Sequence, residues 1–278
     1  MRPKNAIGIG APSRQLIMLV FTALAAFPIY FMLVNAFKSN AEYVTNAFGP
    51  PHDWTTETMR QALSSGSLYR WLANSALITA ASVGISTTLA AFAAYPIALM
   101  RWRAGRYLLA VLISLMAVPP IVLVIPLFQE AVSLQVLNTY GAVIVIYTGL
   151  LLPFSTFLLA TFFRGLPFTL FEAARIDGAG TLRILLAIVI PLSRAALMTV
   201  VIVQALWVWN EVLIALVFLQ HDNLRTLMVG LTVFQSRYHL DVPLVMAGML
   251  WATIPMVALF LAGQRFFVRG LTAGGVKG

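Results

Sequence analysis

The charged residues of this chain fall into seven clusters, and six long uncharged stretches separate them. Only 10% of the residues are charged, whereas a soluble domain carries about 25%. A helix that crosses a bilayer needs about 20 predominantly apolar residues. The pattern therefore predicts an all-α membrane protein with six transmembrane helices. The six stretches are Gln15 to Phe37, Trp71 to Met100, Tyr107 to Gln129, Ala131 to Phe163, Ala195 to Asn210 and Val242 to Gln264.

For three of these stretches, the length does not by itself say where the helix lies or whether the segment stays in the membrane. The fourth is longer than one crossing, so we expect an outer loop and then a helix from about Gly141 to Phe163. The fifth is short, and we expect its helix to run on past Glu211 through the apolar residues Val212 to Leu219. The first follows basic residues as a signal peptide would, but it exceeds the usual core of about 7–15 residues and has no small-residue cleavage site. We predict that it stays as an anchor helix.

The orientation follows from the loops, because positively charged residues near span ends stay in the cytoplasm. The termini and the loops on their side hold thirteen basic and two acidic residues, and the other side holds five basic and seven acidic ones. Both termini are therefore expected in the cytoplasm. The predicted organisation is an N-terminal tail over 1–14, a six-span domain over 15–264 with a cytoplasmic loop over 164–194, and a cytoplasmic tail over 265–278. The net charge of +9 reflects this topology and not nucleic-acid binding.

The cytoplasmic loop has its own structural signals. Thr169 and Glu172 have the spacing of a capping box, which predicts the start of a short helix. Gly178 can adopt the left-handed conformation that ends helices. Glu172 could therefore serve only to cap its own helix.

A second short helix is expected after the glycines. Gly180 loosens the chain, Thr181 can cap the new helix, and Pro191 would begin the next span. Four apolar side chains of this helix need cover: Leu182, Ile184, Leu185 and Leu186.

The order Glu172-Ala173-Ala174, Gly178, Ile188 and Pro191 resembles the EAA loop of ABC-importer permeases, with the pattern E-A-A-x-x-x-G-x(9)-I-x-L-P. Ile190 replaces the usual leucine, which is a conservative departure. Nearly the whole chain is similar to the smaller six-span permease of the carbohydrate, maltose-type branch. The supporting segments are Asn35-Ala36-Phe37-Lys38, Asn74-Ser75, Leu137-Asn138-Thr139, Trp209-Asn210-Glu211 and the ending Gly270 to Gly278.

The resemblance implies a type I ABC-importer permease in a bacterial or archaeal cytoplasmic (inner) membrane. The implied partners are a second homologous permease, two copies of a cytoplasmic ATPase subunit that binds ATP and Mg, and an extracytoplasmic solute-binding protein. The residues implied in ATPase coupling are Glu172, Ala173, Ala174, Asp177, Gly178 and Gly180, with Glu172 contacting a basic residue of the ATPase and Gly178 supplying the bend. The tail residues Thr272, Gly274, Gly275 and Lys277 would lie along the same interface.

The sequence supports the need for a separate ATPase subunit. None of its three lysines follows a glycine, so the chain lacks the Gly-Lys-Ser/Thr element of a phosphate-binding loop. No cofactor is expected in this chain.

Polar residues in or beside membrane spans are costly, and a pathway role is their default interpretation. Gln204, Asn210 and Glu211 are such residues around the fifth span. The alternative for the last two is an interfacial cap, with Trp207 and Trp209 as belt aromatics.

The third span contains Pro119, Pro120 and Pro126, which allow a hinge or a tolerated kink; the kink is favoured.

No enzyme or metal site is indicated. The chain has no cysteine, its three histidines are scattered over predicted outer loops, and no serine lies in a Gly-x-Ser-x-Gly motif. A self-sufficient secondary transporter or channel is the main alternative, but Glu130 and Glu211 lie at span ends and not inside spans, which disfavours ion coupling. A membrane scaffold stays open, and the solute could be a sugar or a glycerol-phosphate-type molecule.

Overall fold

The computed structural model describes residues 11–64, 67–100, 103–237 and 241–275, and every regular element in these ranges is a helix. The chain divides into two compact units, which are described separately. The first comprises Met1–Gly66 and Val233–Trp251, and the second Ser67–Thr232 and Ala252–Gly278.

The first unit begins with the long helix α1, Ala11–Ala36, which is exposed along most of its length. Two short helices follow, α2 (Asn40–Thr45) and α3 (Glu57–Ser64). The beginning of α14 (Val242–Gly275) also belongs to this unit. There the indole of Trp251 donates a hydrogen bond of 3.3 Å to the carbonyl of Met59 on α3.

A buried lysine organises the loop after α1. The Lys38 ammonium is fully buried and donates to the carbonyl oxygens of Asn46 at 2.6 Å and Gly49 at 2.7 Å. The Asn35 amide donates to the carbonyl of Ala47 at 3.1 Å. Burial lowers the pKa of Lys38, and the nearby Glu42 carboxylate opposes that shift. The loop is thus attached to the end of α1 at three backbone positions.

The core of the second unit is built from α4 (Ser67–Leu99), α7 (Tyr140–Arg164) and α11 (Arg194–Asn210). Small buried residues on α4, among them Ala90, Ala91 and Ala94, allow close helix packing. The bounds of α7 confirm the helix predicted within the fourth stretch to within one residue at each end. Its N-cap is Thr139, whose side chain accepts the N–H of Ala142 at 3.3 Å.

The third stretch forms two helices, α5 (Arg103–Leu115) and α6 (Pro120–Ser133), which meet at 95°. The kink favoured from the sequence is therefore wrong, because the helix ends completely before Pro119. Pro119 has an extended backbone (φ −63°, ψ 134°) and precedes a second proline. Proline lacks the backbone donor and disfavours a helical residue before it, so the pair starts a new helix. Pro126 lies inside α6.

A second break comes just before the fifth stretch, at the end of the predicted cytoplasmic loop. Short helical elements run from Thr181 to Leu192, and α11 then departs at 76°. Beyond α11 lie α12 (Leu213–Phe218), a 3₁₀ turn η2 (Asp222–Leu224) and α13 (Leu227–Arg237). The expected continuation of the fifth helix past Glu211 is wrong, since α11 ends at Asn210 and the chain is extended at Glu211.

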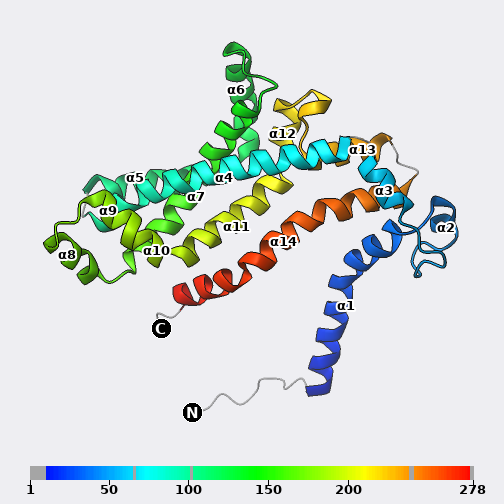
Figure 1. The fold of residues 1–278 in the computed structure, drawn as a ribbon, viewed down its shortest axis with the longest axis horizontal. Coiled ribbons are helices and arrows are strands. Elements are labelled where there is room, and N and C mark those ends of the chain that lie inside the picture. The colour runs from blue at the N-terminus through cyan, green and yellow to red at the C-terminus, as the bar shows by residue number, and fades with distance from the viewer. Residues whose placement is uncertain (1–10, 65–66, 101–102, 238–240, 276–278) are drawn as a thin grey trace. The chain divides into compact units, whose positions relative to one another are not determined.

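In the described part of the chain, four helices are long and apolar enough to cross a membrane: Ser13–Ala36, Ser67–Leu99, Tyr140–Arg164 and Val242–Gln264. The described residues provide six spans if each of the two bent helix pairs counts as one. Six crossings and the cytoplasmic location of both termini stay predictions. Within the second unit, α8 (Phe168–Ile176) and α9 (Thr181–Ile184) lie at the end opposite to α12 (Figure 1).

Candidate functional site

The predicted coupling segment forms a helix, α8, but the capping box is wrong. The helix begins at Phe168 after Pro167, which has an extended backbone and makes no side-chain cap. Thr169 is therefore already inside the helix, because the preceding proline sets its start. Glu172 lies in the middle of α8, and the alternative that it only caps this helix is also wrong.

The Gly178 turn agrees with the sequence. Its φ of 78° confirms the predicted left-handed conformation. The Gly178 N–H donates to the carbonyl of Arg175 at 3.0 Å, and the Ala179 N–H donates to the carbonyl of Ala174 at 2.9 Å. These bonds close the C-terminal turn of α8. Glu172, Ala173, Asp177, Gly178 and Gly180 are all exposed, and Ala174 is half-buried.

The second short helix, α9 (Thr181–Ile184), starts directly after Gly180, which has an extended backbone. The predicted Thr181 cap is wrong, because Thr181 is the first helical residue and makes no cap hydrogen bond.

The helix continues as a π-helix, η1 (Leu185–Val189), and then as α10 (Ile190–Leu192). The Ile190 N–H donates to the carbonyl of Leu185, five residues back. Pro191 next to this wide turn cannot donate and would crowd the carbonyl of a regular helix. Pro191 therefore lies inside α10, and the break that starts α11 follows at Ser193.

The loop buries only part of its apolar surface. Phe171, Ile184 and Leu185 belong to the hydrophobic core of the second unit. Two of the four leucine and isoleucine side chains predicted to need cover are thus covered by the chain itself. Leu182 (57% exposed) and Leu186 (50%) are not, and Ile176 is 86% exposed. The coupling segment therefore combines a fixed inner face with an exposed face that mixes apolar side chains with charges of both signs, including Arg175 and Arg183.

The C-terminal residues Thr272, Gly274 and Gly275 lie in α14, which continues beyond the predicted end of the sixth span. Lys277 lies outside the described residues.

Gln204 is buried among three helices. Its amide nitrogen donates to the carbonyl of Leu151 at 3.2 Å and to the hydroxyl of Ser155, both on α7. Its amide oxygen lies 3.5 Å from the hydroxyl of Thr87 on α4. Gln204 thus connects α11 to both neighbouring helices.

Asn210 and Glu211 are at the end of α11. The exposed Asn210 donates through Nδ2 to the carbonyl of Leu206 at 2.7 Å. Glu211 is half-buried, and its carboxylate accepts the N–H groups of Ile214 at 2.9 Å and Ala215 at 3.2 Å. These are the first free N–H groups of α12, so Glu211 caps that helix.

Sequence analysis did not single out Tyr147. It is fully buried on α7, and its hydroxyl donates to Glu211 Oε2 at 2.5 Å. The ring of Trp207 meets the Tyr147 ring edge-on, with 5.9 Å between centroids. A phenol in the middle of an uncharged stretch is a polar group in lipid, and this signal could have pointed to Tyr147.

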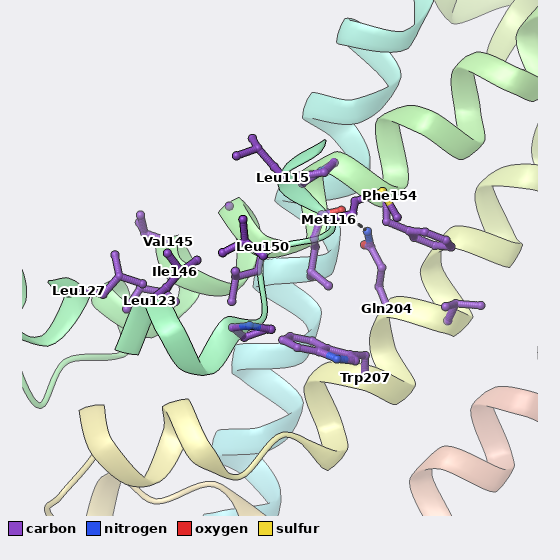
Figure 2. Close-up of a pocket in the computed structure, with 16 residues that line it drawn as sticks. Leu115, Met116, Leu123, Leu127, Val145, Ile146, Leu150, Phe154, Gln204 and Trp207 are labelled. Carbon is purple, nitrogen blue, oxygen red and sulfur yellow. Dashed lines mark hydrogen bonds between the residues drawn. The ribbon is translucent and has the colours of Figure 1, made fainter. Parts of the chain in front are cut away.

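Gln204, Asn210 and Glu211 border two cavities, and Tyr147 lines neither of them. One, of about 620 Å³, lies among α5, α6, α7 and α11 and is mainly apolar. Figure 2 shows Gln204 and Trp207 projecting into it from α11, with Leu123 and Leu127 on another part of its wall. The other, of about 510 Å³, is lined by Val203, Leu206, Trp207, Asn210 and Glu211. Among the residues that the structure describes, no lysine or arginine lines either cavity.

The chain is similar to known transport proteins over nearly its full length. It is 35% identical over 269 residues to the melibiose/raffinose/stachyose import permease protein MelC of Bacillus subtilis (strain 168), covering 94% of this chain and 97% of that protein. It is 31% identical to the arabinooligosaccharides transport system permease protein AraQ of Halalkalibacterium halodurans (strain ATCC BAA-125 / DSM 18197 / FERM 7344 / JCM 9153 / C-125), covering 92% of each.

A similar fold occurs in the crystal structure of a bacterial ABC transporter involved in the import of the acidic polysaccharide alginate. The TM-score is 0.82 at 23% identity, over 96% of this chain and all of that chain. Residues 86–271 match the family described as binding-protein-dependent transport system inner membrane component. The resemblance carried by the EAA pattern is thereby confirmed, and this chain belongs to the binding-protein-dependent transport system inner membrane component family.

Proposed function

We propose that this chain is one of the two permease subunits of an ATP-driven sugar importer, and that it engages a separate ATPase through α8 and the Gly178 turn. The observation that carries the proposal is the construction of this segment. Phe171 fixes α8 to the core, while Glu172 and Asp177 are exposed and form no ion pair with any described residue. An anchored helix with carboxylates outside any ion pair, an exposed Arg175 between them and an uncovered Ile176 suits docking to a partly charged, partly apolar cleft that offers Glu172 a basic partner.

The proposed solute is a sugar, because the relatives named above import oligosaccharides and the alginate importer shares the fold. Gln204, Asn210 and Glu211 are proposed to border the pathway. The support is their position beside the two cavities at the end of α11.

The proposed partners are a second permease, two ATPase subunits that bind ATP and Mg, and an extracytoplasmic binding protein, assembled in the cytoplasmic membrane. Thr272, Gly274, Gly275 and Lys277 are proposed to extend the ATPase contact.

A self-sufficient ion-coupled transporter has less support. Such proteins place ionisable groups inside spans. Among the described residues whose burial is assigned, Lys38 is the only fully buried charged side chain. It lies after the end of the first candidate span, Ser13–Ala36, and binds loop carbonyls.

The experiment is purification of a tagged chain from its native host in mild detergent, with identification and counting of the co-purifying subunits by mass spectrometry. The unmodified chain should bring down an ATPase and a second permease. Glu172→Ala should lose the ATPase and keep the permease. Glu130→Ala is the matched control, since Glu130 is an exposed glutamate outside the loop, and it should keep both. Recovery of this chain alone, with transport intact, would overturn the proposal.

A further inference from the structure

Trp207 has no role so far in the proposed transport function. It lies on the last turn of α11, is 38% exposed, and borders both cavities described above. A half-exposed indole beside two cavities can offer one ring face to a solute. Its Nε1 has no hydrogen-bond partner among the described residues.

The indole is held in place from behind. Tyr147 meets Trp207 at an interplanar angle of 86°, and Tyr147 is itself fully buried and bonded to Glu211. A ring fixed by a buried neighbour loses little freedom when it binds a solute, which favours affinity. Trp207 is therefore a preorganised surface.

Polar groups with unused capacity lie next to this surface. Glu211 Oε1 accepts one hydrogen bond, from the Ile214 N–H at 2.9 Å, although a carboxylate oxygen can accept two. Asn210 uses its Nδ2 on the carbonyl of Leu206, and its Oδ1 has no partner among the described residues. Two acceptors are thus available within one turn of Trp207.

The charge of the site selects the solute. Glu211 forms no ion pair among the described residues, and no basic residue lines either cavity. An anionic solute would meet the carboxylate without a compensating cation, which is unfavourable. A neutral sugar has an apolar C–H face that fits an aromatic ring and hydroxyl groups that donate to carboxylate and amide oxygens.

We propose that Trp207, with Asn210 and Glu211, forms a contact site for a neutral sugar during its passage, and that Tyr147 is the positioning residue for this site. The inference rests on the proposed importer function. It adds which side chains contact the sugar and that the sugar is uncharged. It assigns the ring face to Trp207 and the hydroxyl contacts to Asn210, the last residue of α11, and Glu211, the residue after it.

The test uses the complete transporter in proteoliposomes with its binding protein in saturating amounts. ATP-driven uptake of radiolabelled melibiose, raffinose and arabinotriose is measured in parallel with ATP hydrolysis. Trp207→Leu keeps an apolar side chain but removes the ring, and should lower uptake of the transported sugar about 3- to 10-fold with ATP hydrolysis unchanged. Trp207→Phe restores a ring and should recover most of the uptake. Leu216→Ala, at a half-exposed apolar position that lines neither cavity, is the control.

The possible outcomes separate the two proposals. Uptake of none of the three sugars by the unmodified complex would overturn the proposed sugar importer. Uptake by the unmodified complex and equally by Trp207→Leu would overturn only the contact site. Loss of uptake and of ATP hydrolysis together, without recovery in Trp207→Phe, would mean that Trp207 only supports the fold. The charge assignment is tested by Glu211→Gln, which should raise inhibition of uptake by digalacturonate relative to the unmodified complex; unchanged inhibition would overturn it.

Discussion

The hydroxyl of Tyr147 donates a hydrogen bond of 2.5 Å to Oε2 of Glu211 and so joins the N-terminal third of α7 to the end of α11. The same carboxylate accepts the N–H groups of Ile214 and Ala215 at the start of α12. Glu211 therefore follows the last residue of one helix, caps the next with its carboxylate, and is bonded to a third through Tyr147. This arrangement explains why the apolar residues after Glu211 do not extend α11.

Replacing Tyr147 by phenylalanine should loosen this junction without disturbing the ring packing against Trp207. A hydrogen bond to a charged group contributes about 1.5–3 kcal/mol to stability, so the thermal unfolding temperature of the purified complex should fall. Tyr69→Phe, at a 71% exposed position, should leave it unchanged. Equal unfolding temperatures for the two variants would show that the Tyr147 hydroxyl contributes nothing to stability.

The sequence predicted those helices for which a long uncharged stretch is a sufficient signal. The bounds of α4 and α7 lie close to those expected because the uncharged stretches there exceed what one crossing needs. Hydropathy does not report where a helix breaks within an apolar stretch. The break at Pro119 follows from two adjacent prolines, and the break at Glu211 depends on a contact with Tyr147, 64 residues away.

The site shows the same division between local and distant causes. Gly178 was predicted because a left-handed residue is a local requirement that glycine meets. The caps expected at Thr169 and Thr181 failed because Pro167 and Gly180, with extended backbones, already set the helix starts. Tyr147 was missed because its importance appears only when α7 and α11 pack together.

Gly178→Val should uncouple ATP hydrolysis from uptake. The position has open space around it, so the expected effect comes from the backbone, whose φ of 78° is unfavourable for a β-branched residue. Gly178→Asn should retain more coupling, because asparagine tolerates this conformation. Gly141→Val, at an exposed glycine in the first turn of α7, is the control. Normal uptake per ATP in Gly178→Val would defeat the assigned role of the turn.

Gly230→Ala should destabilise the second unit through overpacking. A Cβ at Gly230 would overlap the indole of Trp71. That ring cannot easily move, since its nitrogen donates to the carbonyl of Asp222 at 3.2 Å. Overpacking of this kind costs about 1–3 kcal/mol. Gly84→Ala, where no atom lies within 4 Å of the added carbon, is the matched control in thermal unfolding. A Gly230→Ala variant as stable as Gly84→Ala would mean that Trp71 can repack.

Lys38→Met should release the loop between α1 and α3. The substitution keeps a long apolar stem but leaves the carbonyl oxygens of Asn46 and Gly49 without their donor. A buried group left unsatisfied costs about 1–3 kcal/mol, which corresponds to a roughly 10-fold rise in local opening. Limited proteolysis within 39–56 should accelerate by this factor. Arg60→Met, which breaks the exposed pair with Glu57, should leave cleavage unchanged. Equal cleavage rates in the two variants would remove the anchoring role of Lys38.

The predicted orientation can be tested without background labelling, because the chain contains no cysteine. Single cysteines at the exposed positions His52 and Arg183 lie in a predicted outer and a predicted inner loop. A membrane-impermeant maleimide should label His52→Cys in spheroplasts and Arg183→Cys only in inverted vesicles, because the inner loops hold the excess of positive charge. The unmodified chain should not be labelled in either preparation. Labelling of Arg183→Cys from outside would reverse the topology and place α8 on the side where no ATPase could reach it.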